Sequence, residues 1–102
     1  MKIVAVTSCA TGIAHSYMAA ESLRKAAKEI GDEIKVEVQG AMGIENRLSE
    51  EDIEGAELII FAVDVNVRDR NRFNNKKIFE IGPNEVIHDG KKALLKIKEE
   101  AK

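Results

Sequence analysis

Two near-continuous apolar runs, at residues 2–7 and 58–63, constrain the fold of this chain more than any other feature. Each is far shorter than the roughly 20 apolar residues that span a membrane. Strands that helices cover on both faces of a parallel sheet have this composition, whereas half-exposed strands alternate apolar with polar residues. We therefore expect both runs to be central strands of a parallel sheet.

Two further segments have strand character but are more polar. Residues 34–39 alternate apolar with polar side chains, and residues 77–81 form a shorter candidate. Alternation is typical of a strand with one face in solvent. We expect both segments at the edges of the sheet.

Helical periodicity fills the intervals between these strands. Apolar residues recur with helical spacing over residues 13–30, Gly31 is placed to end that helix, and residues 49–52 resemble a capping box. A last helix is expected to begin near Pro83. The order predicts a small doubly wound, Rossmann-like α/β fold in which helices flank a four-stranded parallel sheet, as one domain at residues 1–102.

Composition excludes several classes of function. The 102 residues include 16 basic and 18 acidic side chains, a net charge of -2, so no overall attraction to nucleic acid is expected. The single cysteine cannot form an internal disulfide, and the two histidines lack the spacing of a zinc site. No signal-peptide pattern precedes the first strand. We expect a cytoplasmic protein without a metal or cofactor.

The lone cysteine, Cys9, lies where the first strand leads into the first long helix. Backbone amides converge there beside the positive end of a helix, at the sheet edge where such folds bind ligands. Small residues would let the backbone close around a phosphate, and hydroxyl groups would donate further hydrogen bonds. The predicted phosphate-binding loop consists of Ala10, Thr11, Gly12, Ile13, Ala14, His15 and Ser16.

Cys9 is the candidate catalytic residue. The thiolate is the nucleophilic form of cysteine, and a helix N-terminus is expected to lower the pKa from about 8.5 toward roughly 3.5 to 7.5. The same amides would hold a transferred phosphoryl group. One alternative stays open: a noncatalytic anion-binding or regulatory module, in which Cys9 only forms part of the wall.

The loop matches no common nucleotide-binding motif, neither a Walker loop nor Gly-x-Gly-x-x-Gly. A second alternative is a cysteine phosphatase of the low-molecular-weight type. Such an enzyme would place an arginine six residues after the nucleophile to hold phosphate bidentately, and this chain has His15 there. Holding phosphate is thus favoured over hydrolysing it. His15 is a candidate for a phosphate contact or for assisting proton movement, with a simple hydrogen-bonding residue as the alternative, and His88 is interpreted as a structural or surface residue.

The stretch at residues 4–21 reads VAVTSCATGIAHSYMAAE. It closely resembles the signature of the fructose-type IIB subunits of the bacterial phosphoenolpyruvate-dependent sugar phosphotransferase system (PTS). The chain departs from the family pattern at Ala10, where proline is common, and at Asn75, where glycine is common. The resemblance continues through residues 37–40, 43–46, 51–53, 62–64 and 72–73.

The resemblance implies a function and partners. In this family a IIA protein carrying phosphohistidine gives its phosphoryl group to the cysteine, here Cys9. The phosphocysteine then delivers the group to a sugar that the membrane IIC permease imports. The implied activity is a protein-phosphocysteine–sugar phosphotransferase with fructose or a related sugar as substrate, cytoplasmic and associated with a permease.

Two segments that follow strands are expected to border the Cys9 loop. Residues 64–77 are rich in basic side chains, which would steer an acidic partner or form ordinary solvated surface. Residues 39–44 would form an apolar docking rim or a simple glycine turn. The candidate partner contacts are Asp64, Arg68, Arg72 and Met42.

Overall fold

Strand β1 (Lys2–Ser8) lies at the centre of a five-stranded sheet of order β3-β2-β1-β4-β5. This arrangement is seen in a computed structural model that describes residues 1–101, so the last residue of the predicted domain lies outside the described part. Strands β2 (Glu33–Gly40) and β4 (Leu58–Val63) flank β1 in parallel, and β5 (Phe79–Ile81) pairs in parallel with β4. Strand β3 (Gly43–Glu45) is antiparallel to β2.

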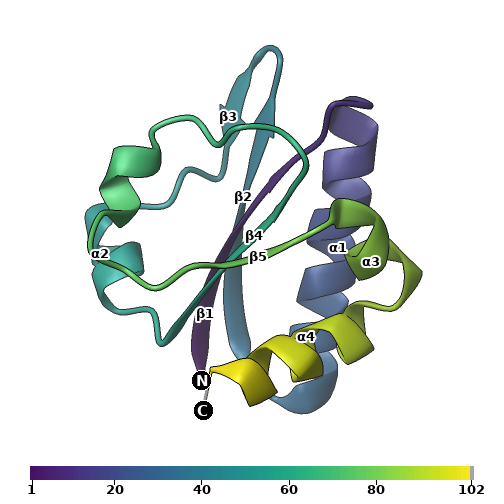
Figure 1. Cartoon of the computed structure of the whole chain (residues 1–102), viewed down its shortest axis with the longest axis vertical. Helices are drawn as coiled ribbons and strands as arrows, with labels where there is room; N and C mark the ends of the chain where they lie inside the picture. Colours follow the sequence, from purple (N-terminus) through teal and green to yellow (C-terminus); the bar gives the residue numbers. More distant parts are fainter. Residues whose placement is uncertain (102) are drawn as a thin grey trace.

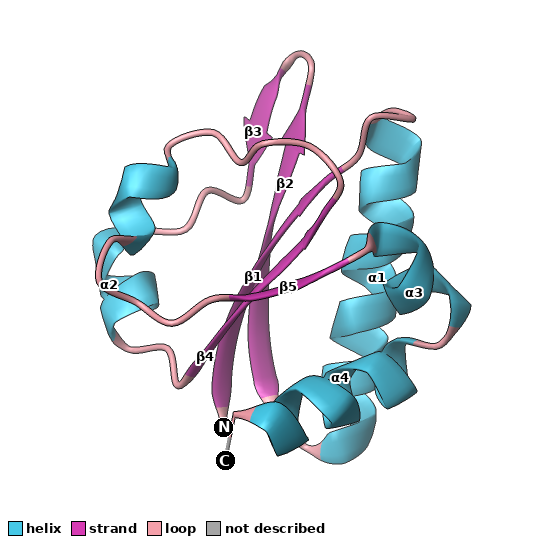
Figure 2. Ribbon diagram, in the orientation of Figure 1, coloured by secondary structure: helices cyan, strands magenta, loops and turns pink. Residues whose placement is uncertain are grey.

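Helices cover both faces of this sheet (Figures 1 and 2). Helix α1 (Ile13–Ile30) packs on one face together with α3 (Pro83–His88) and α4 (Gly90–Glu100). Helix α2 (Glu50–Glu54) and the short 3-10 helix η1 (Arg70–Phe73) lie on the other face.

Two hydrophobic clusters hold these layers together, and β1 contributes to both. Ile3 and Ala5 belong to the cluster under α1 and α4, whereas Val4 and Val6 belong to the cluster on the α2 side. All four side chains are buried. Burial on both faces explains why this strand is apolar without alternation.

The predicted doubly wound α/β class is confirmed. Helix α1 covers the predicted residues and ends at Gly31, which adopts the left-handed conformation (φ 81°) that favours glycine. The predicted last helix is two helices. The break lies at Asp89, whose side chain accepts a hydrogen bond from the Lys92 amide and thereby caps α4.

Two predictions about the sheet were wrong. The sheet has a fifth strand, β3, and this strand is antiparallel, so the sheet is neither four-stranded nor wholly parallel. Strand β2 is not at the edge, because β3 pairs with its last residues, and Glu37 and Gln39 are buried there. The short strand β5 is an edge strand, as predicted.

The topology marks one edge of the sheet for ligand binding. From β1 the chain crosses to β2 on one side, and β4 then lies on the other side of β1. The connections that follow the adjacent strands β1 and β4 therefore run in opposite directions along the sheet, which opens a crevice at the carboxyl ends of these two strands. Within residues 1–101, no helix has the length and apolar character needed to cross a membrane.

Candidate functional site

Cys9 follows β1 directly, so it lies at the crevice that the reversal of strand order creates. A tight turn connects it to α1, in which the Gly12 amide donates a hydrogen bond to the Cys9 carbonyl oxygen at 3.2 Å. Gly12 has a φ of 124°, in the region that side chains other than glycine rarely adopt. The turn leaves the Cys9 side chain half-buried.

A cleft of about 750 Å³ opens beside Cys9. Three parts of the chain form its walls: the Cys9 turn with the start of α1, the β2–β3 hairpin, and the segment that follows β4. The hairpin approaches α1 closely, because a Cβ atom added at Gly40 would overlap the side chain of Ile13. The three predicted segments therefore meet at one site. Of the predicted loop residues, Ala10, Gly12 and Ile13 line the cleft.

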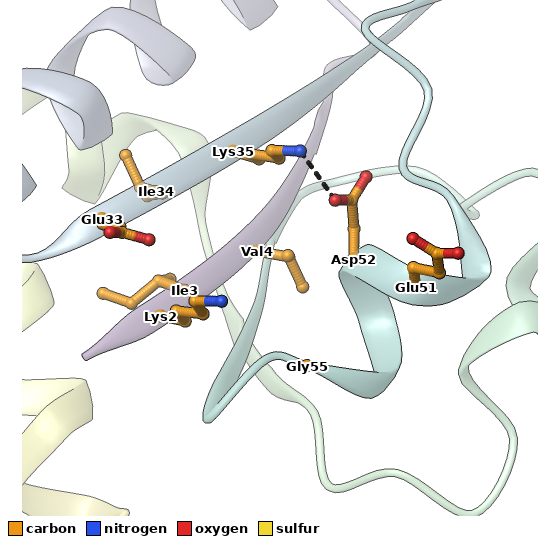
Figure 3. A pocket seen from close by; sticks show the side chains of 9 residues that line it. All are labelled: Lys2, Ile3, Val4, Glu33, Ile34, Lys35, Glu51, Asp52 and Gly55. Carbon is orange, nitrogen blue, oxygen red and sulfur yellow. Dashed lines mark hydrogen bonds and ion pairs between the residues drawn. The ribbon is translucent and has the colours of Figure 1, made fainter.

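A second pocket, of about 390 Å³, lies at the amino end of β1 and is shown in Figure 3. Its charged side chains include Lys35 and Asp52, which form an ion pair at 2.7 Å between Nζ and Oδ1. Cysteine, histidine and hydroxyl side chains are absent from its lining within the described part of the chain. The Cys9 cleft is therefore the candidate functional site.

Asp64 binds the backbone of the Cys9 turn. The Ala10 amide donates a hydrogen bond to Asp64 Oδ1 at 2.8 Å, and the Asp64 amide donates to the Ser8 carbonyl oxygen at 3.2 Å. One amide of the predicted anion cradle is thus occupied by a carboxylate of the chain itself. The first amides of α1 have no hydrogen-bond acceptor within the helix, because no helical carbonyl lies one turn before them. These amides can still bind an anion.

The pKa of the Cys9 thiol is raised above the ordinary value of a free cysteine. Partial burial is the main cause, and the negative charge of Asp64 adds to it, while the Ser16 hydroxyl opposes the rise. The prediction of a lowered pKa was therefore wrong for this state. The helix end is close to Cys9, but desolvation and a neighbouring carboxylate both favour the protonated thiol and raise its pKa.

Ser16 is fully buried in the first turn of α1. Its Oγ interacts with the Cys9 thiol closely enough to affect the pKa, yet it completes no hydrogen bond of good geometry within residues 1–101. A buried hydroxyl without a partner is unusual. It is available to donate to Cys9 Sγ or to a group attached there. His15 Nδ1 is also buried without a partner among these residues.

Glu37 and Arg72 form a buried ion pair that the sequence analysis missed. Arg72 binds Glu37 through two hydrogen bonds, of 2.7 Å to Oε1 and 2.8 Å to Oε2, and the side chains are 0% (Glu37) and 10% (Arg72) exposed. The Leu48 amide and Gln39 Nε2 also donate to the carboxylate, each at 2.8 Å. Burial alone would raise the pKa of Glu37, but these three donors together lower it.

This pair fixes the segment after β4 against β2. Gln39 and Arg68 exchange two hydrogen bonds: the Arg68 amide donates to Gln39 Oε1 at 2.8 Å, and Gln39 Nε2 donates to the Arg68 carbonyl at 3.0 Å. The Arg68 guanidinium also donates to the Gly40 carbonyl oxygen in the β2–β3 hairpin. Arg72 is therefore engaged with the core, and Arg68 lies at the cleft with its guanidinium bound to backbone.

Exposed apolar side chains surround the cleft. Met42, at the tip of the β2–β3 hairpin, is 101% exposed, and three further large apolar side chains that line the cleft are between 37% and 40% exposed. We call this set the apolar rim: Ile13, Tyr17, Met42 and Val65. Exposed apolar patches of this kind mark interaction sites.

Comparisons with known proteins point to one family. A family profile described as "PTS system, Lactose/Cellobiose specific IIB subunit" matches residues 4–96. The "PTS system fructose-like EIIB component 2" of Escherichia coli K12 is 42% identical over 94% of this chain and 91% of its own length. The "PTS system fructose-specific EIIB'BC component" of Xanthomonas campestris is 45% identical over 98% of this chain, which spans only 17% of that relative.

Solved structures agree with these relatives. The solution structure of the Enzyme IIB subunit of the PTS system from E. coli K12 superposes with a TM-score of 0.89 at 41% identity, covering 96% of this chain and 91% of that one. A domain of fruA from Bacillus subtilis superposes with a TM-score of 0.84 at 39% identity, covering 97% of this chain and 94% of that one.

Proposed function

Because the chain belongs to the PTS IIB family, as a fructose-type IIB component, we propose that Cys9 is the residue on which it carries the phosphoryl group. The activity of the family is phosphotransfer, and the chain is accordingly a phosphoryl carrier of a sugar PTS. The observation that supports Cys9 is its position: the single cysteine of the chain lines the cleft at the carboxyl end of β1.

Phosphoryl transfer to Cys9 would begin from a phosphohistidine on a IIA partner. The Cys9 Sγ–P bond forms as the N–P bond of the phosphohistidine breaks. The thiol loses its proton in this step, and the released imidazole nitrogen takes one up. This matches the raised pKa of Cys9, because the thiol needs to lose its proton only during the transfer. We propose that the amides of Ile13, Ala14 and His15 and the Ser16 hydroxyl bind the new phosphoryl group. Their position in the first turn of α1 supports this, as does the buried Ser16 Oγ, which has no hydrogen-bond partner within residues 1–101.

In the second transfer the phosphocysteine gives its group to a sugar. A sugar hydroxyl oxygen forms the new O–P bond, the S–P bond breaks, and Cys9 regains a proton as the hydroxyl loses one. We propose fructose or a related sugar as the acceptor, since the relatives above are described as fructose-like or fructose-specific. Relatives described as EIIB'BC and EIIBC components support a membrane IIC permease as the partner that presents the sugar, with this chain on its cytoplasmic side.

The apolar rim supports a docking role around Cys9. A IIA partner must bring its phosphohistidine to Sγ, so its surface would cover the exposed side chains beside the cleft, Met42 above all. Met adapts its shape to different surfaces, which suits a carrier with two successive partners. Arg68 is the basic candidate at the cleft, whereas Arg72 supports this surface from the core.

The test is phosphorylation of the isolated chain. The chain is incubated with phosphoenolpyruvate, the general phosphotransfer proteins and a fructose-type IIA, and its intact mass is measured. One added phosphoryl group is expected, absent from Cys9→Ser and retained in Ser8→Ala, the matched control on the neighbouring residue. A phosphoryl group that persists in Cys9→Ser would assign the carrier role to another residue. Turnover of an aryl phosphate by the chain alone would instead indicate a phosphatase.

A further inference from the structure

The carboxylate of Asp64 occupies a backbone amide of the Cys9 turn with which a bound phosphate would form a hydrogen bond. Asp64 Oδ1 accepts the hydrogen bond of the Ala10 amide at 2.8 Å, and Ala10 immediately follows Cys9. Any anion that enters the turn from solution must compete with this carboxylate for the amide. The Ala10 amide of the turn is therefore occupied by a side chain of the protein itself in this structure.

The charge of Asp64 is not neutralised by a neighbouring cation. Among residues 1–101 no lysine, arginine or histidine forms an ion pair with Asp64. Arg68, the cation that lines the cleft, directs its guanidinium to the carbonyl oxygens of Gly40 and Gly43. A free phosphate dianion thus meets an uncompensated negative charge as well as an occupied amide.

The Asp64 side chain can also move away from the Ala10 amide. The residue is exposed and lies in the bend that follows β4, so its side chain can rotate into solvent without burial of its charge. A phosphoryl group bonded to Cys9 Sγ stays beside the Ala10 amide whatever its affinity for the turn, because the covalent bond holds it at a high effective concentration. Such a group can displace Asp64 where a freely diffusing anion cannot.

We propose that Asp64 guards the Cys9 turn: it keeps free anions such as inorganic phosphate out, and it moves aside for a phosphoryl group that is covalently bound to Cys9. This specificity role rests on the proposed carrier function. It explains why the chain holds a carboxylate at a site meant for an anion. Asp64 acts here through the Ala10 amide and through its charge, so it is a positioning residue and not a catalytic one.

Alkylation of Cys9 tests the guard without any partner protein. Negatively charged iodoacetate and neutral iodoacetamide both react with the thiolate. The ratio of their rates is therefore independent of the thiol pKa and reports how readily an anion reaches Cys9 Sγ. In Asp64→Asn the amide oxygen can still accept from Ala10, but the charge is gone. We expect the iodoacetate-to-iodoacetamide ratio to rise about fourfold or more, as for a unit charge roughly 5 Å away in a mainly aqueous cleft. Asp69→Asn removes a charge from the same segment outside the cleft and should leave the ratio unchanged.

Binding of inorganic phosphate gives a second, independent measurement. Amide NMR signals of Ala10 and Gly12 are followed as phosphate is added, and Asp64→Asn and Asp64→Ala should bind at least about tenfold more tightly than the unaltered chain. The proposal is overturned if the ratio stays the same in Asp64→Asn, if Asp69→Asn raises it equally, or if no variant binds phosphate better. Failure of Cys9 phosphorylation would refute the carrier function and leave these outcomes untouched, so the two failures are distinguishable.

Discussion

Replacing Arg72 with methionine should destabilise the fold severely. Methionine keeps an unbranched stem of similar path, but it removes the cation that compensates Glu37, whose side chain is 0% exposed. Breaking a buried pair from one side typically costs about 3–5 kcal/mol, since it leaves an unpaired buried charge. A domain of this size has about 5–15 kcal/mol of stability in total. The variant should therefore lose between about a fifth and nearly all of its stability at neutral pH.

The opposite change, Glu37→Gln, should cost less, about 1–3 kcal/mol. Glutamine keeps an oxygen that can accept from the Leu48 amide, and Arg72, at 10% exposure, has some access to water. In the double variant Glu37→Gln/Arg72→Met the unpaired charge disappears. The double variant should lose less unfolding free energy than the two single variants together, by about 0.5–3 kcal/mol, as expected for residues in direct contact.

The assay is urea unfolding followed by circular dichroism over a pH series. The pKa of Glu37 is lowered in the folded protein, so the stability it contributes is complete above its ordinary value of 4.5 and is lost as the pH falls through the lower, folded value. In Arg72→Met the main cause of that lowering is gone and burial raises the pKa of Glu37 instead. Lowering the pH should then reduce the difference in the free energy of unfolding between Arg72→Met and the unaltered chain. A cost below about 1 kcal/mol at pH 7, or an unchanged pH dependence, would show that Glu37 is not left as an unpaired buried charge.

Four further outcomes are expected. The rate of Cys9 alkylation by iodoacetamide should still be rising at pH values of about 9, because burial and Asp64 raise the thiol pKa above 9.0; a plateau near neutral pH would contradict this. Gly90→Ala should cost about 1–3 kcal/mol in urea unfolding, since the added Cβ would lie 2.7 Å from the Ser22 carbonyl oxygen. Gly82→Ser should gain roughly 0.5 to 1 kcal/mol, because its hydroxyl can cap α3 in open space; a loss would show that the cap does not form. The Asp52 carboxyl should titrate at about 2 by NMR, held low chiefly by the Lys35 ammonium, and a midpoint near 3.8 would argue against that ion pair in solution.

Local patterns were enough to locate most elements. Helix α1 and strand β4 have the predicted bounds, because helical periodicity and an unbroken apolar run depend only on neighbouring residues. The cap at Gly31 and the capping box at Ser49 also formed as predicted. Strand β3 was missed because it is three residues long and gains its hydrogen bonds only by folding back on β2.

The burial of Glu37 could not be read from the strand that carries it. An alternating strand is normally half-exposed, and nothing near Glu37 in the sequence shows that a cation will cover it. Arg72, which does so, lies 35 residues further along the chain. The Glu37-x-Gln39 spacing was the available signal, since it puts two polar side chains on one face of β2, but it fits a solvated face equally well.

The same difference between local sequence signals and long-range contacts applies to Cys9. Local backbone preferences are enough to predict the strand, the turn and the helix that bring this cysteine to the carboxyl edge of the sheet. The raised pKa of its thiol and the occupied Ala10 amide depend instead on contacts that form only in the folded chain. Both follow from Asp64, whose carboxylate meets the Ala10 amide across 54 residues of chain, and from burial, which belongs to the packed molecule and not to any segment of it.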